Sequence, residues 1–558
     1  MKAQKYNKFQ ATQIVNLQTL HLDRITFFSY LCGVMLKTPT MKRIASFALL
    51  AAVAICCSLS AYAQDKVVKK VIETGTTDNR TMEHADFLAN RIGGRLIGSA
   101  ALTEAEAWVK EQFESWGLEV MVQEAGEINV GFNRGPWFGR MLSEDGMNLH
   151  FATPSYTAGT KGKQTGHVLI EPKSRREFDR MKGALKGAWV LLDTESDGMA
   201  LHTTPADNEK RAEAIAKNEE IDRQNNEIRR WNYEHRDSEP KKLLEYEKTT
   251  APFYQEMVEA GVLGFIRSAA VPLKIMYDRA GCYDITMDNL PTVCDIMLDE
   301  AQFKVIKEKV QRKDIFQLEF DIRNHFYRGP VKYHNVIGIL RGSKYPKEYV
   351  LAGGHLDAYD GAQGAVDDGN GVSVTMEAAR LLATSGAKPK RTILFCVWTG
   401  EEFGLLGSKF FVENKTVPLD KISNYINRDG GPLCATSVTV PPAMYDDYVS
   451  ICKPLENLNP DFPFTVNKRE GQPQPRPTRA GGSDHAYFAM NGVPTISFRE
   501  SDPKGYNFEY GEIWHTERDI FNKLIPEYME HSAVVTAVVL YGIANLDHLL
   551  SRSGLYKE

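Results

Sequence analysis

Apolar residues recur at helical spacing over residues 79–120, and the pattern then changes to short apolar runs. Leu88, Val109 and Phe113 belong to such a series, which predicts helical structure over 79–120. Gly117 is expected to end the helix, because glycine readily adopts the backbone conformation that follows a last helical turn. The apolar run just after Gly117 predicts the first strand.

Short apolar runs separated by turn residues dominate the next part of the chain. Residues 167–170, 188–192 and 260–266 are examples, and each predicts a short strand. The charged stretch 208–247 interrupts them and is typical of a solvated helical hairpin or arm. We therefore expect an inserted, β-rich domain over 131–330, with a charged helical arm at about 208–247.

Strands and helices alternate from Asn335 onward. Residues 336–340, 349–352 and 392–397 are predicted strands, and 371–383 is a predicted helix with one apolar face. This alternation favours an α/β fold, a mixed twisted sheet with helices on both faces. Such folds place their ligands at the ends of strands.

Residues 41–63 are typical of a targeting segment. A basic head at Met41–Arg43, an apolar stretch over 44–59 and the small residues Ala61 and Ala63 predict a signal peptide cleaved before Gln64. A membrane anchor is the alternative, but the apolar stretch is short for a span of about 20 residues. We expect a secreted or periplasmic protein with no stable membrane span after cleavage.

The remaining length is too great for one simple core and suggests two or three domains. Residues 1–63 are assigned to the upstream segment and signal peptide. The catalytic domain is expected to be discontinuous, with a first part at 64–130 and a second part at 331–558. The net charge of −5 offers no electrostatic basis for binding nucleic acid.

Five cysteines follow the predicted cleavage site, so at least one thiol has no partner within the chain. Cys396 lies in an apolar run and is expected to be a buried strand thiol. The other four allow two disulfides, Cys282–Cys294 and Cys434–Cys452. With so few cysteines, the core must come mainly from apolar packing.

Five segments place histidine or carboxylate side chains after apolar strands or at the start of a helix. They are His355-Leu356-Asp357, Asp367-Asp368, Glu401-Glu402, Asn427-Arg428-Asp429 and Trp514-His515-Thr516. Two imidazoles and three carboxylates suit two Zn²⁺ ions that share one bridging aspartate. One further carboxylate, Glu401, is then left to act as a base.

Each segment alone has a simple structural explanation. Adjacent acids at the start of a helix are usually capping residues, and a Glu-Glu pair usually faces solvent. The candidate ligands lie 12, 35, 27 and 86 residues apart, so they cannot share one helix as in an H-E-x-x-H site. Their combined context favours convergence from separate loops, with Asp357 orienting an imidazole or the base.

These segments together resemble the M28 family of co-catalytic zinc peptidases. The motifs that carry the resemblance are G-G-H-L-D, D-D-G-N-G, W-T-G-E-E-F-G-L-L-G-S, N-R-D-G-G, G-G-S-D-H and W-H-T. The similarity is greatest to members of the carboxypeptidase Q type, which share the segment Pro389-Lys390-Arg391-Thr392. Those members carry an inserted protease-associated domain, which fits the β-rich insertion.

The resemblance implies a role for each matching residue. His355 and Asp429 would bind one Zn²⁺, Glu402 and His515 the other, and Asp367 would bridge them. Glu401 would be the general base that takes a proton from the metal-bound water to form hydroxide, and would then act as the general acid. Asp357 would orient other residues of the site without binding a metal ion. Arg428 is a candidate contact for a substrate carboxylate.

The implied activity is that of a secreted di-zinc exopeptidase acting on short peptides or dipeptides. Whether it acts as an aminopeptidase, a carboxypeptidase or a dipeptidase stays open, because a fold does not decide a substrate. A glutaminyl cyclase on the same fold and a non-catalytic binding protein on the same scaffold are the alternatives. The oligomeric state is open as well, and a homodimer is one of the options.

Overall fold

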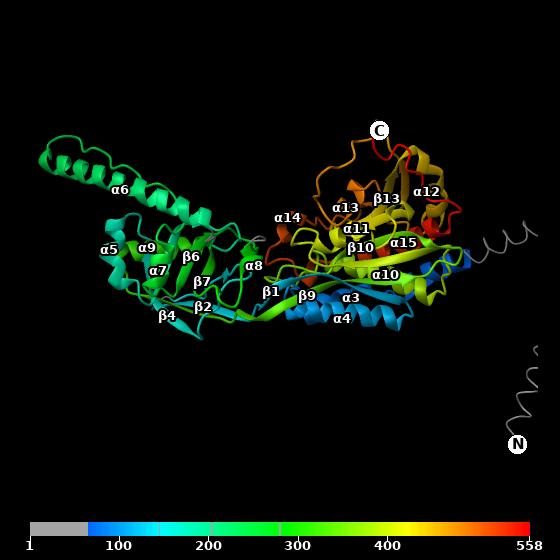
Figure 1. Cartoon of the computed structure of the whole chain (residues 1–558), viewed down its shortest axis with the longest axis horizontal. Helices are drawn as coiled ribbons and strands as arrows, with labels where there is room; N and C mark the ends of the chain where they lie inside the picture. Colours follow the sequence, from blue (N-terminus) through cyan, green and yellow to red (C-terminus); the bar gives the residue numbers. More distant parts are fainter. Residues whose placement is uncertain (1–64, 144–145, 202–204, 278–280, 558) are drawn as a thin grey trace, which may run out of the picture. The chain divides into compact units, whose positions relative to one another are not determined.

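A computed structural model describes residues 65–143, 146–201, 205–277 and 281–557 of the 558-residue chain (Figure 1). The predicted signal peptide and its cleavage site lie outside these residues. Within the described ranges, no helix is both long and apolar enough to cross a membrane.

The central sheet of the catalytic part has five strands. Their order is β1 (Glu119–Asn133), β9 (His325–Leu340), β11 (Arg391–Trp398), β10 (Tyr345–His355) and β12 (Ile422–Asn427). β10 runs parallel to β11 and β12, whereas β1 and β9 are antiparallel to their neighbours. All the strands predicted from Asn335 onward are confirmed, and the sheet is mixed as expected.

Helices cover both faces of this sheet, as the α/β pattern predicted. On one face, Trp398 of β11 packs with Phe411 of α11 (Leu406–Glu413) and Phe488 of α13 (His485–Met490). The opposite face is covered by α4 (Ala100–Ser115), α10 (Gly369–Thr384) and α15 (Pro526–Asn545). α10 begins two residues before the predicted 371–383 helix.

The predicted helical region 79–120 is divided into separate pieces. They are α3 (Thr81–Asp86), the π-helix η1 (Phe87–Ile92) and α4. The break falls where Gly93 and Gly98 adopt positive φ angles of +84° and +72°, which interrupt a right-handed helix. Gly117 also has a positive φ and follows the end of α4, as predicted.

The inserted part contains a seven-stranded sheet. In order across the sheet, the strands are β2 (Trp137–Leu142), β8 (Gln317–Ile322), β4 (Gln164–Ile170), β5 (Ala188–Glu195), β6 (Gly264–Ala269), β7 (Cys294–Asp299) and β3 (Phe151–Ala152). The neighbours β4 to β7 are parallel. Helices α5 (Arg175–Met181) and α7 (Tyr254–Glu259) pack on one face and α9 (Glu300–Arg312) on the other, so this part is α/β rather than mostly β.

Two long strands connect the insertion with the catalytic part. β1 and β9 pair continuously in register from Glu119↔Ile339 to Asn133↔His325, apart from two bulges. The sequence-based limits 131 and 330 therefore fall inside these strands. The connection is a hydrogen-bonded ribbon instead of two flexible linkers.

The charged arm consists of one long helix, α6 (Pro205–Glu234), and a non-helical return segment. Three asparagines of α6 each donate to and accept from the backbone of one return residue: Asn218 with Glu247, Asn225 with Leu244 and Asn232 with Lys241. Seven helical residues rise about 10.5 Å and three extended residues span about 10 Å, so the spacing of the asparagines along α6 matches the spacing of their partners along the return segment.

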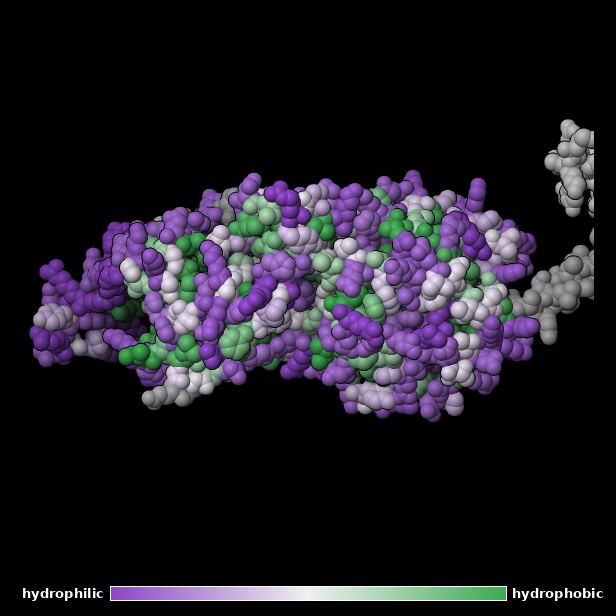
Figure 2. Space-filling view, turned by 90° about the horizontal axis from the view of Figure 1, so that it is seen from below, coloured by the Kyte–Doolittle hydropathy of each residue, from purple (hydrophilic) through white to green (hydrophobic). Residues whose placement is uncertain are grey.

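The face of the molecule drawn in Figure 2 is mostly hydrophilic, with apolar residues in small separate groups.

A smaller sheet and short helices complete the catalytic part. The sheet has the order β14 (Thr465–Lys468), β13 (Cys434–Val440), β15 (Phe498–Ser501), next to α12 (Tyr445–Cys452). α14 (Tyr510–Ile513) leads directly into the segment that carries His515.

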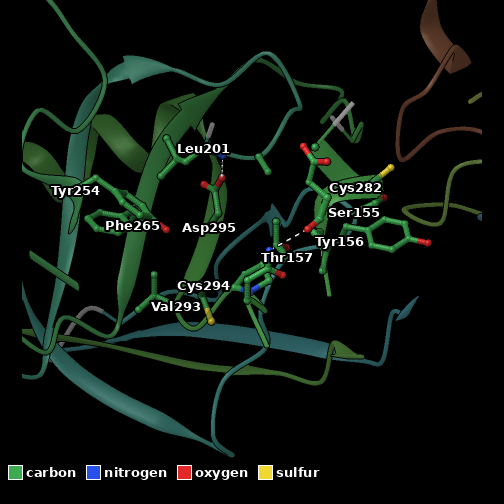
Figure 3. A pocket seen from close by; sticks show the side chains of 16 residues that line it. Ser155, Tyr156, Thr157, Leu201, Tyr254, Phe265, Cys282, Val293, Cys294 and Asp295 are labelled. Carbon is green, nitrogen blue, oxygen red and sulfur yellow. Dashed lines mark hydrogen bonds between the residues drawn. The ribbon is translucent and has the colours of Figure 1, made fainter. Parts of the chain in front are cut away.

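None of the five cysteines, which all lie in the described part of the chain, forms a disulfide. Cys282, in α8 (Gly281–Asp284), and Cys294, in β7, line one cavity of about 360 Å³ in the insertion. Their side chains lie apart in this cavity (Figure 3). Cys434 and Cys452 are likewise unbridged, so neither expected disulfide forms. Cys396 is buried in β11, as predicted.

Replacing Gly371 with alanine should destabilise the protein. A Cβ at Gly371 would lie 1.5 Å from the carbonyl oxygen of Arg428, which is main chain and cannot move alone. Overpacking of this kind costs about 1–3 kcal/mol. Chemical denaturation should show that loss for Gly371→Ala and no change for Gly183→Ala, where no atom lies within 4 Å. Equal stability of the two variants would contradict this packing.

Candidate metal centre

The structure brings all five predicted ligands to one edge of the central sheet. Their donor atoms form two groups, His355 with Asp367 and Asp429, and Asp367 with Glu402 and His515. Within each group the donor atoms lie within 4.8 Å of one another. Asp367 belongs to both groups, one oxygen lying 3.2 Å from His355 Nε2 and the other 3.7 Å from His515 Nε2.

His355 stands at the end of β10, and its ring orientation is fixed locally. Its Nδ1 lies 2.8 Å from the carbonyl oxygen of Asp357, to which an Nδ1–H donates. This contact fixes the ring so that Nε2 faces Asp367 and Asp429. The preceding Gly354 lies inside the strand instead of in a turn, and a Cβ there would meet the Asp368 carboxylate at 2.2 Å.

Asp357 fixes the segment that carries Glu401 and Glu402. One of its carboxylate oxygens accepts from the backbone N–H of Glu401 and the other from that of Glu402, both at 3.1 Å. Its contact to the backbone of both glutamates positions them without occupying their carboxylates. Asp357 therefore holds the backbone of the candidate base and of one candidate ligand together.

The loop that carries Asp367 is held in place by hydrogen bonds with Asp519 and Arg95. Asp519 accepts hydrogen bonds from the backbone N–H groups of Val366 and Asp367, at 2.6 and 3.3 Å. Arg95 is fully buried and donates to five backbone carbonyls, those of Leu88, Gly93, Leu356, Gln363 and Gly364. Arg95 therefore connects the loop after His355 with the loop before Asp367.

Only a weak signal in the sequence points to Arg95. It lies in the glycine-rich break between two helices, where a basic residue usually faces solvent. Burial lowers the pKa of Arg95 to about 10, so the guanidinium stays charged at neutral pH. Its positive charge faces Asp519, Asp357, Asp368 and Asp367.

Burial and mutual repulsion shape the charge of the site. Burial raises the pKa of Glu401 and of Glu402, and the neighbouring carboxylates raise both further. Burial also raises the pKa of Asp429. Burial opposes ionisation of Asp367, but the contact with His355, the nearby charges of His355 and His515 and a hydrogen bond from Tyr510 together lower its pKa. Adjacent buried carboxylates of this kind are stabilised by a cation.

The donor set fits divalent metal ions. Carboxylate oxygens and imidazole nitrogens are the ligands of zinc sites in which no cysteine takes part. Glu402 Oε1 is buried and has no hydrogen-bond partner among the residues that the structure describes, which a buried carboxylate oxygen rarely tolerates. Its other oxygen lies 3.0 Å from His515 Nε2. Two cations of charge +2 would neutralise the excess of negative charge.

The insertion contributes to the site, which the sequence did not reveal. The Tyr277 hydroxyl donates to the backbone carbonyl of Glu402. The backbone N–H of Ile275 donates to the carbonyl oxygen of His515 at 2.8 Å. His515 has a φ of +59°, a strained conformation for a non-glycine residue, and this contact helps to hold it.

Arg428 does not have the position expected of a substrate contact. Its side chain is buried and forms an ion pair of 2.8 Å with Glu500. The pair lies behind Asp429 and away from the cavity lining. A buried, paired guanidinium is not available to a substrate carboxylate, so the prediction for Arg428 is wrong.

A cavity of about 260 Å³ opens onto the metal centre. Its lining consists of Asp367, Glu401, Glu402, Asp429, Gly430, Gly482, Tyr510, Trp514 and His515. The side chain of Glu401 is 11% exposed, so it can be reached from this cavity. Both candidate ligand groups and the candidate base therefore face one small opening.

Comparisons with known proteins relate the chain to a peptidase family. Residues 335–540 match the family model described as peptidase family M28. Carboxypeptidase Q of Mus musculus is 26% identical over 498 residues, 88% of this chain and 91% of that protein. The Homo sapiens protein of that name is 24% identical over 500 residues, 88% of this chain and 90% of that protein.

A solved structure shows the same fold. It is the crystal structure of a peptidase M28 precursor from Shewanella amazonensis SB2B, with a TM-score of 0.52 and 19% sequence identity. The superposition covers 88% of this chain and 98% of that one. The fold class expected from the sequence is thus confirmed over most of the chain.

Arg95→Lys should destabilise the protein although it keeps the charge. An ammonium group has three donors and cannot reach all the carbonyls that Arg95 binds, and each buried carbonyl left without a donor costs about 1–3 kcal/mol. We expect a loss of about 2–4 kcal/mol in chemical denaturation. Arg91→Lys, on the exposed surface, is the control and should change stability little. An unchanged unfolding midpoint for Arg95→Lys would contradict the role of Arg95.

Proposed function

The chain belongs to peptidase family M28 and is a metallopeptidase; on this premise we propose that it is a secreted co-catalytic zinc exopeptidase that hydrolyses short peptides. The observation that carries the proposal is the pair of ligand groups that share Asp367, with Glu401 beside them. His355 and Asp429 would hold one ion, Glu402 and His515 the other. When bound, zinc supplies Lewis-acid polarisation of a carbonyl and lowers the pKa of water.

Glu401 has the properties of a proton carrier in this site. Its carboxylate lies 4.0 Å from His355 Nε2 and faces the cavity without belonging to either ligand group. Its raised pKa favours holding a proton that it has accepted. In hydrolysis it would take the proton of the attacking water and give it to the amine nitrogen as the C–N bond breaks.

The size of the cavity favours an exopeptidase. Ligand pockets usually measure about 300–1,000 Å³, and the metal cavity of about 260 Å³ is at or below the small end of that range. Such an opening suits the end of a short peptide better than the middle of a folded chain.

The proposal of secretion rests on the predicted signal peptide at 41–63. N-terminal sequencing of the exported protein should find Gln64 as the first residue.

A substrate panel tests the proposal directly. The panel contains an unblocked dipeptide, an N-blocked peptide, a C-amidated peptide and a Gln-initiated peptide, each with and without a chelator. We expect cleavage that the chelator abolishes and added zinc restores. Loss of ammonia from the Gln-initiated peptide without any cleavage would instead show a glutaminyl cyclase.

Glu401→Gln should abolish most turnover and leave the metals bound. The amide keeps the shape of the side chain but cannot accept the proton, so kcat should fall by a factor of about 10² to 10⁴. Metal content should equal that of the wild type, because Glu401 lies in neither ligand group. Glu413→Gln, at the exposed end of α11, is the control. Undiminished hydrolysis by Glu401→Gln would remove Glu401 from the mechanism.

A further inference from the structure

Lys274 of the insertion is fixed next to the metal cavity by its backbone. The segment Leu273–Ile275 runs antiparallel to the segment after His515, with a bridge between Lys274 and Thr516. The backbone N–H of Ile275 donates to His515, and the N–H of Glu517 donates to the Leu273 carbonyl at 3.0 Å. These contacts do not involve the Lys274 side chain, so a substitution there should leave the segment in place.

The ammonium group of Lys274 lies against a tryptophan that lines the cavity. Its Nζ is 4.0 Å from the centroid of the Trp514 ring. Trp514 lines the metal cavity, is 43% exposed and stacks on the ring of the candidate ligand His515 at 4.1 Å. A single aromatic ring therefore separates the lysine from a candidate metal ligand.

Among the described residues, no carboxylate lies within ion-pair distance of Lys274. Other cations of the catalytic part are paired. Arg518 and Lys523 both bind Glu512, at 2.7 and 3.1 Å. Arg428 is buried and paired with Glu500. Within the described part of the chain, the Lys274 side chain contacts the face of Trp514, which orients the ammonium group but leaves its N–H donors available.

We propose that Lys274 binds the free C-terminal carboxylate of the peptide and so makes the enzyme a carboxypeptidase or dipeptidase. The inference rests on the proposed peptidase function and adds which end of the substrate is read. The remaining lining of the cavity is rich in carboxylates, which would repel an anionic terminus. A cation against Trp514 offers that terminus a partner a short distance from the metals.

The test compares a free-acid peptide with its C-terminal amide, using the zinc-loaded enzyme. We expect the wild type to prefer the free acid at least tenfold in kcat/KM. Lys274→Met keeps the aliphatic stem over Trp514 and removes the charge. It should lower kcat/KM about 10- to 100-fold for the free acid, mainly through KM, and change the amide little. Lys274→Arg should restore much of the preference.

A matched control exists on the charged arm. Lys241 Nζ lies 4.1 Å from the centroid of the Trp231 ring, the same kind of contact, but Trp231, unlike Trp514, does not line the metal cavity. Lys241→Met should behave as the wild type with both substrates. This control separates the loss of a cation over a tryptophan from the loss of this particular cation.

Three outcomes would overturn the inference. They are a wild type that cleaves acid and amide equally, a Lys274→Met variant that loses activity on both alike, and a preference that follows an acidic side chain instead of the terminus. The first two leave the peptidase function intact, because cleavage still occurs. A wild type that cleaves no peptide with zinc present would refute the proposed function itself, and this inference with it.

Discussion

The repulsion among buried carboxylates at one sheet edge is the constraint on which the site depends. Asp367 and Glu402, which are buried, and Asp429, whose side chain is 11% exposed, converge on two imidazoles. Like charges in such surroundings are stable only with protons or cations among them. The fold keeps the group together through contacts to main chain, from Asp357, Asp519 and Arg95, which leave the ligand atoms themselves available.

The insertion is part of this arrangement instead of a separate attachment. A continuous ladder between β1 and β9 connects it to the central sheet. Its segment around Ile275 binds the backbone of one candidate ligand, and Tyr277 binds the backbone of another. Because these contacts involve carbonyl groups, the insertion can influence the shape of the site without supplying a ligand. Residues of the insertion near the metal cavity can then change the substrate specificity while the candidate metal ligands stay the same.

Local sequence patterns predicted the sheet, the helices and the candidate ligands because each depends on neighbouring residues. The period of apolar positions predicted β10, β11 and α10, and the motif context predicted which histidines and carboxylates converge. The region 79–120 was predicted as continuous because the positive φ angles of Gly93 and Gly98 have no effect on periodicity. Arg95, Tyr277 and Lys274 were missed, since the partners that connect them with the site lie more than 100 residues away in the chain.

Anomalous diffraction at the zinc edge, from crystals grown with zinc, tests the central claim most directly. The account predicts two anomalous peaks, one on each side of Asp367, the first next to His355 and Asp429 and the second next to Glu402 and His515. A single peak, or two peaks that do not share Asp367, would contradict a co-catalytic centre. No peak among these residues would contradict the metal site altogether.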